Sequence, residues 1–272
     1  MTIDLKSWES YRVEPGKRIR LKQIPAGATD FCGDKATARA TVKKYRKQID
    51  ELVSVLAMEE RRSLLVVLQG VDASGKDGAV RRIFTGVNPQ HCRVISFKEP
   101  NREERAHDYL WRIYRSAPAK GELRVFNRSQ YEDVLVPRAH GKMSAKEMHI
   151  RLRQIAEMER SWTESGIAIR KFFLHISRKE QGSRFQKRLN DPEKHWKVQE
   201  SDFADRKLWP KFQQAYEAVL SRTSTDYAPW YAVPADHKWY RDVVIAGAVL
   251  GTLRAMRPRR PMPRLDSKLY QL

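Results

Sequence analysis

The segment that most constrains the fold is a short hydrophobic run that stops at a glycine-rich turn. Residues 64–69 (LLVVLQ) lead into Gly70, and the pattern of a helix begins after Gly75 and Lys76. The two glycines allow a tight turn with several N–H groups pointing inward, and the following helix presents its positive end to the same point. Strand, turn and helix in this order predict a phosphate-binding loop. The contacts are assigned to Gly70, Ala73, Ser74, Gly75, Lys76, Asp77 and Gly78.

Two carboxylates distinguish this loop from the usual one, which continues with a Ser or Thr that binds magnesium. Asp77 stands at that position, and Asp72 lies inside the turn. A carboxylate would repel phosphate unless a divalent cation lay between them, and Mg²⁺ favours such oxygen ligands. Asp72 is therefore the first candidate for a metal ligand. Asp77 is either a second ligand or a favourable charge at the helix N-terminus.

The rest of the chain alternates apolar runs with helical patterns. An amphipathic pattern covers residues 36–62. Further strands are expected within residues 92–97, 122–127, 167–177 and 230–235. This alternation predicts a parallel five-stranded sheet covered by helices on both faces, with ligands at the carboxyl ends of the strands. The late apolar run at residues 243–253 is too short to cross a bilayer and is expected to form a buried helix.

The expected organisation is one domain with two appendages. Residues 1–35 are irregular and predict an N-terminal arm, residues 36–258 the domain, and residues 259–272 a basic C-terminal tail. Within the domain, the charged segment at about 178–220 is expected to be helical on both sides of a break at Asp191-Pro192.

Charge and cysteine content limit the partners and the compartment. The formal net charge of +20 and the isoelectric point near 10.1 indicate a polyanionic partner: nucleic acid, an anionic membrane surface or a phosphate polymer. Charge alone does not choose among them. Two cysteines form no disulfide framework, and the N-terminus lacks the apolar core of a signal peptide. A cytoplasmic location is expected.

Several long motifs together resemble the polyphosphate kinase 2 family, over roughly residues 49–256. They are GVDASGKDGAVRRIF (70–84), FNRSQYEDVLV (126–136), FFLHISRKEQGSRFQKRLNDPEKHWK (172–197) and TSTDYAPWYAVPADHKWYRD (223–242). The resemblance implies a P-loop kinase-like three-layer α/β/α fold with a helical lid at about 178–220. It also implies reversible phosphoryl transfer between inorganic polyphosphate and AMP or ADP.

The same resemblance implies the partners. Mg²⁺, with Mn²⁺ as the alternative, would bridge the two phosphate chains. Adenine nucleotides are the expected acceptors, with guanine nucleotides as further candidates, and two or four copies of the chain are expected to associate. Neither nucleic acid nor a membrane is expected as a partner.

The motif at residues 126–136 resembles the third subclass of the family, which phosphorylates both nucleoside mono- and diphosphates. Asn127 stands where another subclass has a metal-binding aspartate; it is counted among the phosphate-binding candidates, and its carbonyl oxygen could still bind a metal-held water. Arg128 matches the motif arginine and could hold a phosphate through two hydrogen bonds. Its other interpretation is an internal ion pair with Asp133. Glu132 and Asp133 could restore the missing acidity as metal ligands, whereas Glu132 could also be a solvated helix residue.

Basic residues elsewhere are further candidates. Arg178 is expected to reach the transferring phosphate, and Arg184 and Arg188 to bind phosphate from the lid, although a charged helix is usually a solvated face. Lys98 and Arg102 could line a polyphosphate channel or bind the acceptor phosphate. His107 and His175 lack the surroundings of a phosphohistidine and are interpreted as structural.

Two other functions remain open at this stage. An ATP-dependent nucleotide kinase would share the loop and the fold. A basic nucleic-acid-binding protein with a vestigial nucleotide loop would share the charge, but it would have no use for the acids in the loop. Comparing polyphosphate with ATP as the donor separates the first of these from polyphosphate-dependent transfer.

Overall fold

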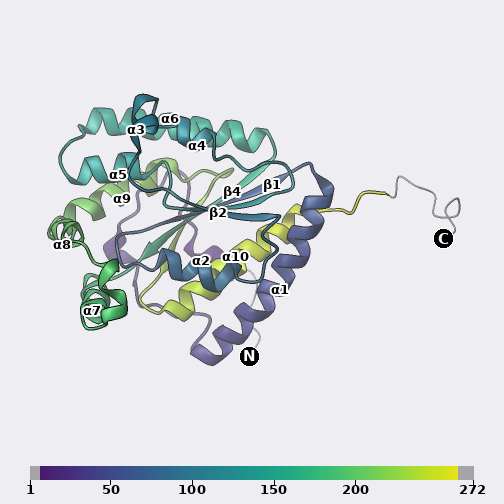
Figure 1. Ribbon diagram of the computed structural model, residues 1–272, viewed down its shortest axis with the longest axis horizontal. Coiled ribbons are helices and arrows are strands. Elements are labelled where there is room, and N and C mark those ends of the chain that lie inside the picture. Colours follow the sequence, from purple (N-terminus) through teal and green to yellow (C-terminus); the bar gives the residue numbers. More distant parts are fainter. Residues whose placement is uncertain (1–6, 263–272) are drawn as a thin grey trace, which may run out of the picture.

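The computed structural model describes residues 7–262, which contain a five-stranded parallel sheet in the order β2-β3-β1-β4-β5 (Figure 1). The strands are β1 (Ser63–Gln69), β2 (Cys92–Ser96), β3 (Leu123–Asn127), β4 (Ile167–His175) and β5 (Trp230–Pro234). The central strand β1 is buried on both faces, which explains its apolar sequence from Leu64 to Leu68. All five predicted strands are confirmed.

One face of the sheet is covered by α1 (Lys35–Glu59), α2 (Lys76–Phe84) and α10 (Lys238–Met256). Helix α1 begins at Asp34, whose carboxylate accepts a hydrogen bond from the Thr37 N–H at 2.8 Å. Its apolar stripe, with Ile49 at the centre, packs against the core. Helix α10 is buried over most of its length, and this confirms the buried helix predicted around residues 243–253.

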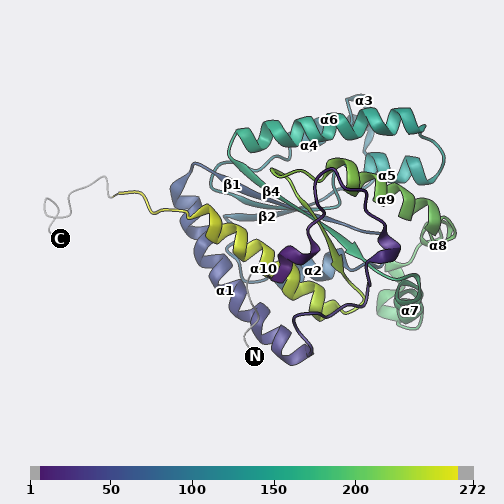
Figure 2. The same ribbon diagram turned by 180° about the vertical axis from the view of Figure 1, so that it is seen from behind.

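The other face is covered by α5 (Glu132–Ala139), α6 (Ala145–Glu164) and α9 (Trp209–Thr223), with the short α3 (Arg102–Ala106) and α4 (Trp111–Tyr114) beside them (Figures 1 and 2). The two apolar cores lie on opposite faces of the sheet. This is the predicted three-layer α/β/α architecture, and it is the P-loop kinase-like fold that the resemblance implies.

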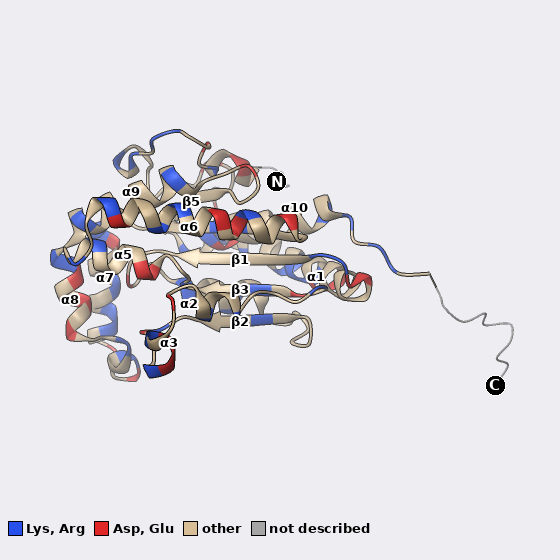
Figure 3. Cartoon of the chain, turned by 90° about the horizontal axis from the view of Figure 1, so that it is seen from above, with Lys and Arg blue, Asp and Glu red and all other residues tan. Residues whose placement is uncertain are grey.

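Helix α7 (Arg178–Leu189), the 3₁₀ helix η3 (Pro192–Lys197) and α8 (Glu200–Lys207) lie at the carboxyl end of the strands. Figure 3 shows Lys and Arg gathered on these helices, at the end of the sheet to which the β1 arrow points. Helix α7 ends at Leu189, and the interruption agrees with the break predicted at Asp191-Pro192. Helix α9, the last part of the expected lid at about 178–220, packs against α5 and α6 in the core, and the lid itself stays a prediction.

Residues 7–34, including η1 (Ser7–Tyr11) and η2 (Leu21–Gln23), pack across β5 and α10 (Figure 2). The Val13 N–H donates to the Trp230 carbonyl at 2.8 Å, and Trp8 is buried with its ring 5.0 Å from that of Tyr231. Residues 263–272 of the expected tail lie outside the described residues, and the domain boundaries stay predictions. Within residues 7–262, no helix combines the length and the apolar character that a bilayer span requires.

Candidate active site

The turn between β1 and α2 has the backbone geometry of an anion cradle. Gly70 and Gly75 have φ angles of 154° and 98°, and Ala73 adopts φ 60°. A Cβ atom on Gly70 would lie 2.7 Å from Ser74 Oγ and 3.0 Å from the Leu174 carbonyl, and one on Gly75 would collide with the guanidinium of Arg241. Only glycine fits at these two positions, as the sequence predicted.

Lys76 is the first residue of α2, and its side chain is buried against the turn. Its Nζ donates to the Gly70 carbonyl at 2.5 Å and to the Val71 carbonyl at 3.3 Å. Burial lowers the pKa of Lys76, and the charge of Arg128 lowers it further, whereas the carboxylates of Asp72 and Glu132 act in the opposite direction. A cation in such dry surroundings interacts strongly with an anionic ligand.

Two arginines from outside the loop hold its outer carbonyls. Arg184 of α7 donates through Nη1 to the Ala73 and Ser74 carbonyls at 3.0 and 2.8 Å, and Arg241 of α10 donates to the Ser74 carbonyl at 3.1 Å. The remaining nitrogens of Arg184 donate to Glu180 and to the carbonyls of residues 235–236. All three nitrogens of its guanidinium thus have protein acceptors, so Arg184 supports the loop from behind.

Arg241 is a site residue that sequence reasoning missed. It is fully buried and is held by the neighbouring Asp242, which also pairs with Arg82 of α2. The available signal was an Arg-Asp pair at the start of an otherwise apolar helix, since buried charges are normally paired.

Arg128, Asp72 and Glu132 meet in front of the loop. Arg128 follows β3 with φ 65°, and its Nη2 lies 2.9 Å from Asp72 Oδ1, while Nη1 lies 3.9 Å from Glu132 Oε2. Burial raises the pKa of Glu132, against the opposing charges of Arg128 and Lys76. The ion pair considered for Arg128 and Asp133 is not formed, because Asp133 pairs instead with Arg112 of α4 at 2.9 Å.

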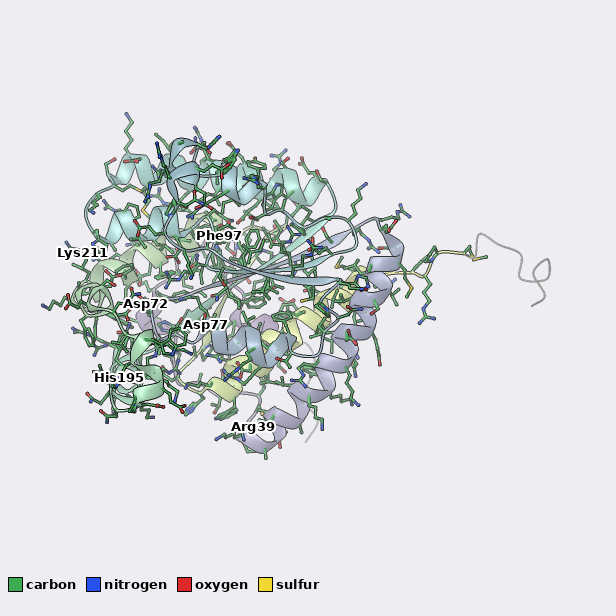
Figure 4. All side chains as sticks on the ribbon, in the orientation of Figure 1. Arg39, Asp72, Asp77, Phe97, His195 and Lys211 are labelled. Carbon is green, nitrogen blue, oxygen red and sulfur yellow. The ribbon has the colours of Figure 1, made fainter. Side chains whose placement is uncertain are left out.

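The oxygen atoms at this site suit a hard cation. Asn127 donates to Asp77 Oδ1 at 2.8 Å, whereas its own Oδ1 and the hydroxyl of Ser74 are buried without a hydrogen-bond partner. Within residues 7–262, no cluster of three or more His, Cys, Asp or Glu side chains could hold a metal ion by itself. The carboxylates of Asp72 and Glu132 and the unpartnered oxygen of Asn127 are ligands of the kind that Mg²⁺ binds, one or two carboxylates together with water and substrate phosphates. Figure 4 shows Asp72 and Asp77 at the carboxyl end of the sheet, with His195 on the side of α7 and η3.

The contacts described for the remaining basic candidates are with other parts of the chain, not with this centre. Arg178 begins α7, and its carbonyl accepts from Arg206 at 2.9 Å. Arg188 donates to the Lys197 carbonyl at 3.2 Å, which ties α7 to η3. Lys98 and Arg102 are exposed near the start of α3.

The two histidines have structural surroundings, as interpreted from the sequence. His107 stacks on Trp111 with ring centroids 4.0 Å apart. His175 contacts the Ile24 carbonyl at 3.0 Å, and burial lowers its pKa.

A cationic pocket of about 570 Å³ adjoins the back of the loop and was not foreseen from the sequence. Eight Lys and Arg side chains line it, against three acidic ones. Four of the eight come from one side of α1: Lys35, Arg39, Lys43 and Arg46. Figure 4 shows Arg39 on that helix. The signal in the sequence was their spacing of four, four and three residues, which places them along one helix face.

Comparison with known proteins identifies the family of the chain. Residues 33–261 match the family model described as polyphosphate kinase 2. The chain is 44% identical to an AMP/ADP-polyphosphate phosphotransferase of Meiothermus ruber, over 96% of this chain and 98% of that protein. It is 36% identical to an ADP-polyphosphate phosphotransferase of Rhodopseudomonas palustris, over 97% and 96% of the two chains.

A solved structure extends this likeness to three dimensions. The crystal structure of polyphosphate kinase 2 from Arthrobacter aurescens TC1 superposes with a TM-score of 0.91 at 37% identity, and the match covers 95% of this chain and 92% of that one. The chain described here therefore belongs to the polyphosphate kinase 2 family.

Proposed function

We propose that this protein transfers phosphoryl groups reversibly between inorganic polyphosphate and the adenine nucleotides AMP and ADP. The names of the relatives from Meiothermus ruber and Rhodopseudomonas palustris support this substrate class. The observation that carries the proposal is the meeting of Lys76, Arg128 and Asp72 at one phosphate-sized turn.

Transfer at this site would proceed directly between two phosphate chains. The N–H groups of the loop and the Lys76 ammonium would hold one phosphate, and Arg128 would bind the equatorial oxygens of the transferring group. For this, Arg128 exchanges its contact with Asp72 for a phosphate, which leaves the Asp72 carboxylate available to a cation. No protein nucleophile is required.

The proposed cofactor is Mg²⁺, with Mn²⁺ as the alternative. When bound, Mg²⁺ would supply positive charge that neutralises the phosphate oxygens during transfer. Asp72 is the first proposed ligand and Glu132 the second, with the Asn127 carbonyl oxygen close to the same centre. Asp133 is left out because its carboxylate is engaged by Arg112.

The cationic pocket is the proposed binding site for the remainder of the polymer. Arg184 lines the pocket and also contacts the loop carbonyls, so the pocket begins where the cradle ends. The four basic side chains of α1 extend over about 16 Å of helix, at 1.5 Å per residue. A chain with about one negative charge per phosphate would meet a cation at each helical turn.

The segment from α7 to α8 is the proposed lid over the nucleotide. Gln181 of α7 donates to the Asp72 carbonyl at 3.1 Å, and this contact between α7 and the loop supports the proposal. Arg178 and Arg188 are its proposed phosphate contacts, while Lys98 and Arg102 remain candidates for the acceptor phosphate on the opposite side.

The test is a comparison of donors and acceptors with purified protein and Mg²⁺. Polyphosphate with AMP should give ADP and ATP, and polyphosphate with ADP should give ATP; GMP tests the second base. Faster transfer to AMP from ATP than from polyphosphate would favour a conventional nucleotide kinase. Tight binding of DNA or RNA without any turnover would favour the nucleic-acid-binding alternative. Light scattering of the same sample tests the predicted dimer or tetramer.

A further inference from the structure

A fully buried ion pair lies beneath the site, in the core between β4 and α6. Lys171 Nζ is 2.5 Å from Glu159 Oε2, and both side chains have no exposed surface. The ammonium also donates to the Thr223 carbonyl at 2.7 Å. Such a pair is a poor source of stability, because removing two charges from water offsets most of their attraction. The pair therefore points to a role other than stabilising the fold.

The pair is connected to the segment that carries Arg128 and Glu132. The Tyr131 hydroxyl donates to Glu159 Oε1 at 2.8 Å and accepts from Lys171 Nζ at 3.0 Å. Gln130 Nε2 donates to the same Glu159 oxygen at 3.0 Å. Tyr131 and Gln130 are fully buried and lie in the chain between the two site residues.

The segment needs such support because its backbone is strained. Arg128 has φ 65°, a left-handed conformation that a non-glycine residue keeps only when its surroundings fix it. From the side of the loop, the Arg128 N–H donates to the Leu68 carbonyl at 3.0 Å. The Gln69 amide is oriented so that both its nitrogen and its oxygen form hydrogen bonds: the nitrogen donates to Glu132 Oε1 at 2.8 Å, and the oxygen accepts from the Ser129 N–H at 3.1 Å. From the core, the side chains of the buried pair contact Gln130 and Tyr131, and Thr223 and Trp230 also lie against the Tyr131 hydroxyl.

We propose that Glu159 and Lys171, acting through Tyr131, are positioning residues that hold Arg128 and Glu132 in register with the phosphate loop. The pair holds residues 128–132 from the core, while Gln69 holds the same residues from the side of the phosphate loop. Neither charge touches a substrate. Because the effect on turnover is read through phosphoryl transfer, this inference rests on the proposed function.

The first test is Tyr131→Phe, which keeps the ring and removes only the hydroxyl that joins the turn to the pair. We expect kcat to fall at least tenfold, with KM for polyphosphate and for AMP changed less than twofold. The matched control is Tyr227→Phe, which removes a hydrogen bond of 3.2 Å to the Ala156 carbonyl on the same helix as Glu159 but does not touch the turn. Equal kcat values for the two variants would overturn the proposal.

The second test separates positioning from stability. The double variant Glu159→Leu with Lys171→Met replaces the pair by apolar side chains, a change that often leaves a fold intact. A protein that melts at the wild-type temperature but turns over at least tenfold more slowly supports the proposal, and one that melts normally with full kcat overturns it. If the double variant does not fold, Tyr131→Phe still decides.

Hydrogen exchange provides a readout that needs no activity. In Tyr131→Phe, amides of residues 127–133 should exchange at least fivefold faster than in the wild type, while those of α10 should not change. Unchanged exchange at residues 127–133 would contradict the proposal. A wild-type protein that cannot use polyphosphate would refute the proposed function instead, and this exchange measurement would still judge the positioning role.

Discussion

Asp72 and Arg128 contact each other at 2.9 Å in this structure, and each is proposed to exchange the other for substrate or metal. The effect of Asp72 on catalysis would pass through the metal, whereas Lys76 would act on the phosphate directly, so variants of the two residues should respond differently to Mg²⁺. We expect Lys76→Ala and Asp72→Asn each to lower kcat at least a thousandfold, about 4 kcal/mol of transition-state stabilisation. Raising Mg²⁺ should partly restore Asp72→Asn and leave Lys76→Ala inactive. Turnover near the wild-type rate in either folded variant would remove that residue from the site.

Glu132 shows how a site residue can weaken the fold. Burial raises the pKa of Glu132 above its value in the unfolded chain, so the native state binds the proton more tightly. The stability of the protein therefore falls as the pH rises from the unfolded-state pKa to the native-state pKa. Glu132→Gln should therefore melt about 2 °C higher than the wild type at pH 7, and the difference should vanish at pH 4. Thermal unfolding at the two pH values measures this. A variant that melts lower at pH 7 would show that the ion pair with Arg128 outweighs the burial.

Helix α1 combines an apolar stripe toward the core with a basic face toward the pocket. If this face binds the polymer, Arg39→Ala with Lys43→Ala should raise KM for long polyphosphate about tenfold and leave KM for AMP unchanged. Lys44→Ala with Lys47→Ala removes the same charge from the same helix outside the pocket, and should change neither constant. Equal effects of the two pairs would show that net charge, rather than the pocket, attracts the polymer.

Elements were predictable from this sequence wherever local pattern and burial agree. The central strand is apolar from Leu64 to Leu68 because helices cover both its faces, and the turn after it requires glycines because of its positive φ angles and because a Cβ atom there would collide with neighbouring atoms. The partners of single arginines were not predictable. Phosphate binding by Arg184 stays a prediction, and its hydrogen bond to the Ala73 carbonyl depends on how α7 packs against the loop, which the sequence does not show. The Lys171–Glu159 pair is equally hidden, because its members lie on different elements.

The whole molecule carries 53 Lys and Arg against 33 Asp and Glu, far more positive charge than the site itself uses. A long polyanion displaces counterions over its whole length, whereas AMP does so at one point. The apparent affinity for long polyphosphate should therefore fall at least tenfold between 50 and 200 mM salt, and that for AMP less than threefold. Binding measured at several salt concentrations gives both slopes. Parallel slopes would assign the excess charge to another partner.

The hydrogen bonds of Arg184 also determine which part of the molecule can move. Its guanidinium joins three pieces of chain: the loop at residues 73–74, the turn at residues 235–236 and the first half of α7. These pieces must move as one body, because any rotation of α7 would break several buried hydrogen bonds together. The nearest break in the helical backbone lies beyond Leu189, where Asp191-Pro192 interrupts it. A bend at that break would also have to release the hydrogen bonds that Arg206 of α8 donates to the Arg178 carbonyl and to Gln181 of α7, so the proposed lid and the cradle are linked along its whole length.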